Sequence, residues 1–237
     1  MIKYGLTLFT AVMVLSSCEN ENSQGNSENV INENAATFKE IGTITIGATG
    51  AAEISAYDEV SKKLFTVNNS GTNKIDVIDL SNPSTPVLLA SIDLVTYNGA
   101  ANSVATFNGK LAVAMESTVS KQDSGKVLVF DTTTYSLIKQ ITVGALPDMI
   151  TFSADGKFIV TANEGEPNDD YSKDPDGTVS IIEVNNNYAV TTLDFSSFSS
   201  QLSTLKANGF RIASPTNNFA SDIEPEYITI SSDSKTA

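Results

Sequence analysis

The sequence predicts an all-β protein built as a β-propeller of four-stranded blades. Three stretches repeat one pattern of strands, and their first strands read Glu53-Ile-Ser-Ala-Tyr-Asp, Ser103-Val-Ala-Thr-Phe-Asn and Met149-Ile-Thr-Phe-Ser-Ala-Asp. The equivalent residues Ile54, Val104 and Ile150 lie 50 and 46 residues apart, within the roughly 40 to 50 residues of a propeller repeat. Turn signals rich in Gly, Pro and Asn separate the strands, and they support the same repeat.

The three blades are expected over residues 53–93, 101–143 and 148–194. In the first blade the strands should cover 53–58, 63–68, 74–79 and 87–93, with a turn rich in Pro and Ser before the fourth strand. In the second blade, Asn108-Gly109 suits a type I′ hairpin turn because both residues tolerate positive φ. Asp155-Gly156 takes the same place in the third blade.

The two ends of the repeat region also carry strand patterns. Residues 40–47 alternate Ile with Thr and are expected to form a strand of the blade that closes the ring. A fourth blade begins at Glu226-Tyr-Ile-Thr-Ile and stops at Ala237. Because a propeller needs about four to eight blades to close, we expect residues 38–237 to be an incomplete amino-terminal arc of about three blades plus the start of a fourth, truncated at the carboxyl terminus.

The first residues have the pattern of a bacterial lipoprotein signal. Lys3 precedes an apolar run, and Leu15-Ser-Ser-Cys18 resembles a lipobox, so cleavage is expected before Cys18. Residues 1–17 are then a signal peptide, Cys18 carries the lipid, and the polar residues 18–37 form a disordered tether. The alternatives are a secreted protein or an uncleaved membrane helix, although the apolar run is short for a bilayer span. We expect an exported protein anchored to a bacterial membrane, at the outer membrane or cell surface.

The charge balance restricts the partners of the chain. The formal net charge is −14, and loss of Lys3 with the signal peptide makes it −15. With one arginine and scattered lysines, the chain lacks the basic arrays that bind phosphate backbones, so nucleic acid is not an expected partner. An acidic surface favours cations instead.

Two insertions interrupt the blade pattern, at residues 163–177 and 195–225. In the second, Phe195, Phe198, Leu202 and Leu205 have the spacing of a short amphipathic helix, which we expect to cap the propeller face. The first is acidic and carries the candidate metal ligands Glu164, Glu166, Asp169, Asp170, Asp174 and Asp176. Because histidine is absent, serine-histidine-aspartate catalysis and imidazole ligands are excluded, and carboxylate oxygens at this density suit Ca²⁺.

Part of this insertion nearly matches the spacing of a calcium-binding loop, with Ser172, Asp174, Asp176, Gly177 and Glu183 at the relevant positions. A strand rather than a helix follows, and the alternative is a solvated acidic loop.

Strand register indicates a second set of ligands, because Ala52, Asn102, Asp148 and Glu226 occupy equivalent places and Glu53 is adjacent to Ala52. With Glu164 and Glu224, we expect an oxygen-rich site at one mouth of the channel that holds a metal or polarises a bound ester through it. The alternative is that these residues line a water-filled channel. Arg211 is expected to neutralise one of these carboxylates or to bind an anion.

Four motifs resemble the choice-of-anchor I family: Gly50-Ala-Ala-Glu-Ile, Ala145-Leu-Pro-Asp-Met, Ala162-Asn-Glu-Gly-Glu-Pro-Asn-Asp-Asp-Tyr and Asp222-Ile-Glu-Pro-Glu-Tyr. The resemblance covers about residues 38–237. It implies an exported bacterial propeller with a surface anchor, similar to the mesenchyme-specific cell-surface glycoproteins of animals. Some members are labelled alkaline phosphatases, by likeness to propeller phosphatases with carboxylate-bound calcium and iron.

These observations leave two functions open. The first is a cell-surface lipoprotein whose propeller is a binding scaffold for an unidentified extracellular ligand or protein, with bound calcium. The second is a metal-dependent phosphoesterase that uses a carboxylate-bound metal site. The sequence shows candidate ligands for the second function, but no established catalytic residue.

Overall fold

The computed structural model describes residues 34–47, 49, 51–212 and 218–237. The predicted signal peptide, Cys18 and most of the predicted tether lie outside these residues. The chain divides into two units, Met1–Lys39 and Glu40–Ala237. In the described part of the first unit, Ala35–Thr37 form a short 3₁₀ turn, η1. All the features below belong to the second unit.

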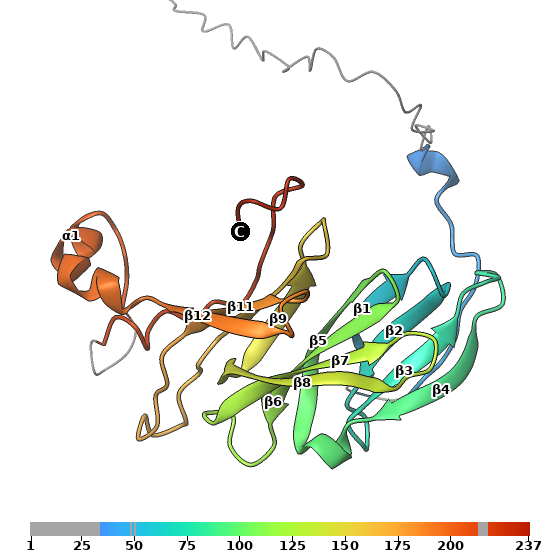
Figure 1. Ribbon diagram of the computed structural model, residues 1–237, viewed down its shortest axis with the longest axis horizontal. Helices are drawn as coiled ribbons and strands as arrows, with labels where there is room; N and C mark the ends of the chain where they lie inside the picture. Colours follow the sequence, from blue (N-terminus) through green and yellow to red (C-terminus); the bar gives the residue numbers. More distant parts are fainter. Residues whose placement is uncertain (1–33, 48, 50, 213–217) are drawn as a thin grey trace, which may run out of the picture. The chain divides into compact units, whose positions relative to one another are not determined.

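Within the described residues, three four-stranded antiparallel sheets follow one another along the chain, and each is one predicted blade (Figure 1). Blade one contains β1 (Ala51–Asp58), β2 (Lys63–Asn68), β3 (Lys74–Asp79) and β4 (Val87–Asp93). Blade two contains β5 (Gly99–Phe107), β6 (Lys110–Ser117), β7 (Ser124–Asp131) and β8 (Leu137–Ala145). Blade three contains β9 (Pro147–Phe152), β10 (Phe158–Asn163), β11 (Thr178–Glu183) and β12 (Ala189–Asp194). A 3₁₀ turn, η2 (Val95–Tyr97), joins the first two blades. The all-β propeller prediction is confirmed.

The β5–β6 turn has the predicted type I′ geometry, since Asn108 and Gly109 have φ values of 44° and 78°. The corresponding turn of blade three is longer. There Gly156 has a φ of 67° and its N–H donates to Ser153 O, while Ser153 Oγ accepts from Phe158 N. The two turns occupy the same place, but they close by different hydrogen bonds.

The core lies between neighbouring blades. Phe65 and Val67 of β2 pack with Met115 of β6 in the cluster between blades one and two. Ala114, on the opposite face of β6, packs with Ile159 of β10 between blades two and three. Because successive side chains of a strand face opposite sides, a middle strand of apolar residues packs against the blades on both of its sides. Each large side chain that is fully buried in this way stabilises the fold by about 1.5–3 kcal/mol.

A buried carboxylate joins the first two blades at the end of β1. Asp58 accepts hydrogen bonds from Ser61, from Thr132 Oγ1 at 2.8 Å and from the Gly109 N–H at 3.4 Å. Burial alone raises the pKa of the Asp58 carboxyl, but the hydrogen bonds from Ser61, Thr132 and Gly109 lower it, and the net pKa lies below its ordinary value. Asp58 therefore holds the β5–β6 and β7–β8 turns of blade two against the end of β1 in blade one.

Two predicted strands are not formed. Residues 40–47 cross blade one without a ladder partner in the described part of the chain, and Glu226–Ile230 likewise has none. Alternating Ile and Thr give a segment the pattern of a strand, but a strand also needs a neighbour that satisfies its backbone groups. The predicted short helix is confirmed as η3 (Ser196–Gln201) followed by α1 (Leu202–Ala207).

The helical segment packs within its own insertion, and Phe195 and Phe198 at its start also line a pocket with Val160, Val179 and Ile181 of blade three. Helix α1 contacts η3, and the Phe198 ring lies 6.4 Å from the ring of Phe219. No side chain of α1 is fully buried. Among the described residues, no helix is both long enough and apolar enough to span a bilayer.

Candidate acidic site at the mouth of the blades

Each innermost strand begins with a β-bulge. In β5 the pairing jumps from Ala101 to Ser103, and in β9 it jumps from Pro147 to Met149, so Asn102 and Asp148 are the extra residues. In β1 the irregularity spans residues 52–54. A bulge re-aims the side chain of its extra residue. Of the four positions that strand register made equivalent, Asn102 and Asp148 are therefore bulged residues, Ala52 lies in the irregular part of β1, and Glu226 lies outside any strand.

Amide side chains at this end link each blade to the next. Asn69, directly after β2, donates to Ala101 O of blade two at 2.9 Å. Asn102 donates to Pro147 O of blade three at 3.3 Å and to Glu116 Oε2 at 3.4 Å. These contacts join the starts of the innermost strands, so they hold the mouth of the described blades together.

A buried asparagine positions the acidic insertion. The Asn163 side chain is fully buried, donates to Thr178 and Ser180, and accepts from Thr161. The Glu164 N–H then donates to Leu146 O at 2.8 Å, next to the start of β9. The first carboxylate of the insertion is thereby held beside the bulge that carries Asp148.

Five carboxylates gather here, and we call them the acidic mouth: Asp148, Glu164, Glu166, Glu224 and Glu226. Burial raises the pKa of Glu164 to about 7, and the charges of the other four raise it in the same direction. Such mutual repulsion shows that the groups lie within electrostatic reach of one another.

The pKa values of two other members of the acidic mouth are also raised. For Asp148 the cause is burial and then Glu226, with Lys121 acting in the opposite direction. For Glu224 it is burial, followed by nearby carboxylates, of which Asp222 has the largest effect. The acidic mouth is consequently a region of negative potential that a cation would relieve.

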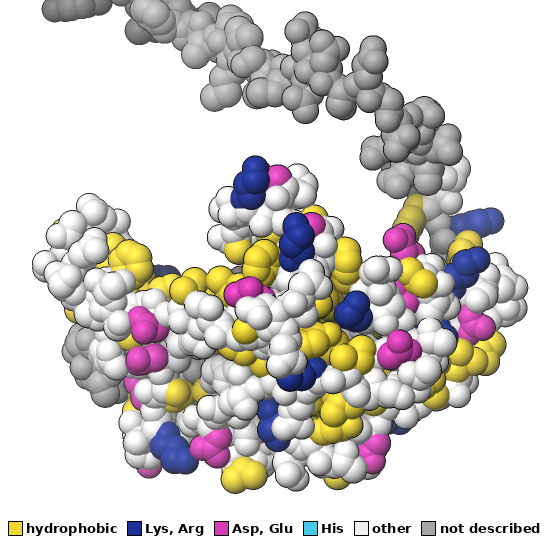
Figure 2. Space-filling view, in the orientation of Figure 1, with side chains coloured by type: hydrophobic (Ala, Val, Ile, Leu, Met, Phe, Trp, Pro, Cys, Tyr) yellow, Lys and Arg dark blue, Asp and Glu magenta, His cyan; other side chains and the backbone are white. Residues whose placement is uncertain are grey.

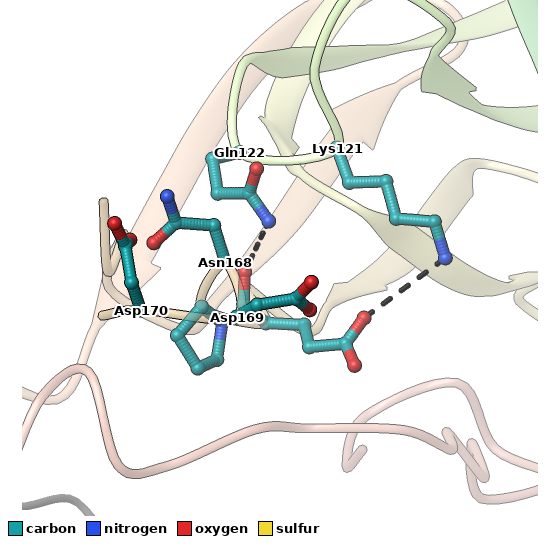
Figure 3. A pocket seen from close by; sticks show the side chains of 7 residues that line it. Lys121, Gln122, Asn168, Asp169 and Asp170 are labelled. Atoms are coloured by element: carbon teal, nitrogen blue, oxygen red, sulfur yellow. Dashed lines mark hydrogen bonds and ion pairs between the residues drawn. The ribbon is translucent and has the colours of Figure 1, made fainter. Parts of the chain in front are cut away.

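A basic group beside the acidic mouth comes from the loop between β6 and β7. Lys121 Nζ lies 3.9 Å from Glu116 Oε2 and 4.0 Å from Glu166 Oε2, and Gln122 donates to Glu166 O at 3.1 Å. Figure 3 shows the contacts of Lys121 and Gln122 with Glu166, at the edge of an open cleft of about 560 Å³. The cleft is lined by Lys121, Gln122, Glu166, Pro167, Asn168, Asp169 and Asp170. The side chains of Asp169 and Asp170 point in different directions in this view.

The remaining candidates lie apart from the acidic mouth or face other partners. Asp170 accepts from the Ser172 N–H, and the hydrogen bonds to Ser172 hold its pKa below the ordinary value. Asp174 accepts from Ser221. The remaining three, Glu53, Asp176 and Arg211, are exposed, and within the described residues the structure gives none of them an ion pair.

The calcium-loop spacing is not realised. Thr178–Glu183 is strand β11, so Glu183 lies roughly 16 Å along an extended chain from the start of that strand. It therefore cannot share an ion with Asp174 and Asp176. In the described part of the chain, no group of three or more carboxylates is arranged around a common point to hold a metal ion. Any cation at the acidic mouth would be bound by side chains that still have to turn toward it.

Sequence reasoning missed Glu116, Lys121 and Gln122. The sequence does carry a signal for Glu116. When the second strands of the three blades are aligned with allowance for the bulged residues, Asn69, Glu116 and Glu164 occupy equivalent positions. Lys121 and Gln122 lie in a loop without any repeat pattern. Their place depends on the contact with Glu166, which only the packed blades reveal.

A family model described as the choice-of-anchor I domain matches residues 53–237. The chain belongs to the choice-of-anchor I family. This match confirms the resemblance carried by the four motifs. Membership implies an exported, cell-surface-associated choice-of-anchor I protein. A comparison with curated proteins finds no match.

Several solved structures are similar to part of this choice-of-anchor I chain at low identity. Hydrazine synthase of Kuenenia stuttgartiensis is 14% identical, with a TM-score of 0.38 over 60% of this chain and 53% of its own. The β-propeller domain of Cps50 (Swd1) from Myceliophteria thermophila is 12% identical, with a TM-score of 0.39 over 59% and 40%. TolB from Acinetobacter baumannii is 17% identical, with a TM-score of 0.39 over 60% and 31%. The chain thus spans between 31% and 53% of the length of these proteins.

Proposed function

We propose that this protein is a lipid-anchored propeller scaffold on the cell surface and that its acidic mouth binds Ca²⁺. The observation that carries the calcium proposal is the convergence of carboxylates from three separate parts of the chain. Asp148 comes from the start of β9, Glu164 and Glu166 come from the acidic insertion, and Glu224 comes from the second insertion. Hard carboxylate oxygens favour a hard cation such as Ca²⁺.

The calcium site we propose is weak and adaptable. Since no three described carboxylates surround a common point, binding has to reorient side chains, which lowers affinity. We therefore expect a dissociation constant of about 10⁻⁴–10⁻³ M, the range of extracellular calcium modules. The bound cation would neutralise repulsion at the mouth and present a rigid face to an extracellular ligand.

The test is a calcium titration of the ectodomain, which begins at residue 19, followed by calorimetry and elemental analysis. The variant Glu164→Gln with Glu166→Gln should weaken calcium binding at least about tenfold, because it removes two of the five carboxyl groups of the acidic mouth. The matched control is Glu59→Gln with Glu183→Gln, which makes the same charge change at the opposite ends of strands β1 and β11.

Equal affinity in both variants would rule out the acidic mouth as the calcium site. The protein hydrolyses a phosphomonoester if the phosphoesterase function is correct, and this activity should need the bound metal and be lost in Glu166→Gln. That outcome would support the metal-dependent phosphoesterase over the binding scaffold. Calcium binding without turnover supports the scaffold.

The anchor is tested separately. Cys18 precedes a polar tether and follows a lipobox-like sequence, so labelled fatty acid should appear on the wild-type protein and disappear in Cys18→Ser. The variant protein should move from the membrane fraction to the soluble fraction. Unchanged labelling or unchanged fractionation would contradict the lipid anchor.

A further inference from the structure

Blade one has a buried carboxylate where the other two blades have a neutral residue. In the pairing of the second and third strands of blade one, Asp76 lies opposite Thr66. The equivalent residues of the third strands are Leu128 in blade two and Ser180 in blade three. Asp76 is fully buried, and a buried carboxylate is costly unless it is paired and hydrogen-bonded. Because two blades form without this charge, packing alone does not explain it.

The Asp76 carboxylate joins an amine to an amide. Its Oδ2 accepts from Asn68 Nδ2 at 2.6 Å, and its Oδ1 lies 3.6 Å from Lys74 Nζ. Asn68 and Lys74 are direct register partners in β2 and β3, so their side chains leave the sheet on the same face. Ser91 Oγ also donates to Oδ1 of the carboxylate. An amine, a primary amide and a carboxylate thus meet on one face of blade one.

The Asn68 amide is held in one orientation and polarised. Its Oδ1 accepts from the Ser70 N–H at 3.0 Å, and its Nδ2 also donates to Ile46 O at 2.9 Å. Asn68 is 1% exposed. A backbone N–H on a carbonyl oxygen stabilises the negative charge that develops there when a nucleophile attacks the carbonyl carbon. The surroundings of Asn68 therefore favour attack on its Cγ.

Lys74 is less exposed than four other lysines that form ion pairs. Its side chain is 28% exposed, against between 54% and 80% for Lys121, Lys157, Lys173 and Lys235. Figure 2 shows lysine and arginine side chains that stand on the surface in this way. The contact with Asp76 gives the Lys74 ammonium group a proton acceptor that is itself shielded from water.

The other two blades contain only parts of this arrangement. In blade two the residues paired at this place are Met115 and Lys126, and Lys126 Nζ donates to Tyr97 O at 2.6 Å. In blade three they are Asn163 and Thr178, and Asn163 Nδ2 donates to Thr178 Oγ1 at 3.1 Å. Blade two therefore has the amine without the amide, and blade three has the amide without the amine. Among the three described blades, blade one combines both with a carboxylate.

We propose that Lys74 and Asn68 form an intramolecular isopeptide bond and that Asp76 transfers the protons. The Lys74 ammonium group passes a proton to Asp76, and the neutral Nζ attacks Asn68 Cγ. The Nζ–Cγ bond forms and the Cγ–Nδ2 bond breaks. Asp76 delivers the two protons that Nζ loses to the departing Nδ2, which leaves as an ammonium ion. Asp76 ends as the carboxylate with which it began, and the reaction needs no oxidant.

The bond closes a loop that holds blade one to blade two. Residues 69–73 lie between the two linked residues, and within them Asn69 donates to Ala101 O at 2.9 Å and Asn73 donates to Gly99 O at 3.2 Å. The sequence has a single cysteine, so no disulfide can form within it. An isopeptide bond restricts the unfolded chain as a disulfide does, and reducing agents do not break it.

The test uses the natural full-length ectodomain, which begins at residue 19, purified in its folded state. Its intact mass should be lower than the sequence mass by one ammonia molecule. Trypsin should not cleave after Lys74, because the amine is acylated, and it should release residues 64–110 as one peptide that also lacks one ammonia. An intact mass equal to the sequence mass, or full cleavage after Lys74, would overturn the isopeptide bond.

Two variants identify the reacting groups. Lys74→Arg keeps the positive charge but has no amine that can form the bond, so it should have its full sequence mass and a thermal midpoint at least about 5 °C lower. Asp76→Asn keeps the shape of the side chain but cannot accept the proton, so Lys74 and Asn68 should stay unlinked. The control Lys126→Arg changes the equivalent amine of blade two and should keep the loss of ammonia.

A loss of ammonia that persists in Lys74→Arg would overturn the proposal. The ammonia would then come from an asparagine that cyclises on its own backbone, as the Asn98-Gly99 and Asn108-Gly109 pairs can do. A complete bond in Asp76→Asn would overturn the role of Asp76. If Asp76→Asn does not fold, the intact mass of Lys74→Arg and the trypsin digest of the wild type still decide whether the bond forms.

Discussion

At the scale of single residues, buried polar side chains decide where the acidic insertion begins. Asn163 makes three hydrogen bonds with hydroxyl groups of its own blade. Its backbone leads directly into Glu164, so the amide sets the direction in which the insertion leaves the sheet. Asp58 has a corresponding structural role at the other end of the blades.

Asn163→Ala should lower the free energy of unfolding by about 2–3 kcal/mol, because Thr161, Thr178 and Ser180 would lose a shared partner in a buried place. Urea unfolding measures the loss. Asn185→Ala, at an exposed position, is the matched control and should change stability by less than about 0.5 kcal/mol. Equal effects in the two variants would show that the hydrogen bonds of Asn163 contribute nothing.

Asp58 should make stability depend on acid pH. Its pKa lies below the ordinary value in the folded protein, so the unfolded chain binds more protons in acid. The contribution is present in full above the unfolded pKa near 4, and it is lost as the pH falls through the lower folded pKa. In Asp58→Asn, stability at pH 7 should fall by about 1–3 kcal/mol.

The pH dependence of Asp58→Asn below pH 4 should also be flatter than that of the wild type. Denaturant unfolding at several pH values between 2 and 7 checks both expectations. Parallel curves for the two proteins would contradict the role of Asp58.

At the scale of elements, strands and turns were predictable because their signals are local. Short continuous apolar runs place β2, β6 and β10, and Asn108-Gly109 sets its own turn geometry. The bulges were not predictable, because they depend on contacts between blades such as the one from Asn102 to Pro147 O. The calcium-loop spacing was misleading for a related reason, since residues in a strand are farther apart than residues in a loop.

Gly144→Val tests the packing of β8 against blade three. The added side chain would displace Asn163, so we expect a loss of about 1–3 kcal/mol in unfolding free energy. Gly144→Ala should give a smaller loss, and Ile138→Val, on the exposed part of β8, should be nearly neutral. Chemical denaturation of the series measures the gradation. Equal stability of the valine and alanine variants would show that β8 does not pack closely at this point.

At the scale of the whole molecule, the acidic composition and the acidic mouth both favour the binding of cations. The chain carries 28 acidic residues against 14 basic ones. The sequence was enough to predict this balance and most members of the mouth. It could not predict Lys121 as the neighbouring cation, because the β6–β7 loop meets the acidic insertion only after two blades have packed.

Salt should therefore stabilise the ectodomain. Raising NaCl from 10 to 150 mM shortens the Debye length from about 30 to about 8 Å, which weakens the repulsion among its acidic groups. We expect a higher thermal midpoint, and a further rise when CaCl₂ replaces NaCl at equal ionic strength. Differential scanning calorimetry measures both steps. The rise in thermal midpoint caused by CaCl₂ should be smaller in Glu164→Gln with Glu166→Gln. An unchanged rise in that variant would show that calcium binds outside the acidic mouth.

The repeated bulge has a consequence for how such a surface can be changed. The extra residue of each bulge stands outside the pairing register, so its side chain can be exchanged without turning the flanking apolar residues away from the core. Asn102 also holds blade two to blade three through Pro147 O, so its exchange would cost stability. Asp148 is therefore the bulge position at which the binding preference of the mouth can be changed with the least effect on the surrounding strands.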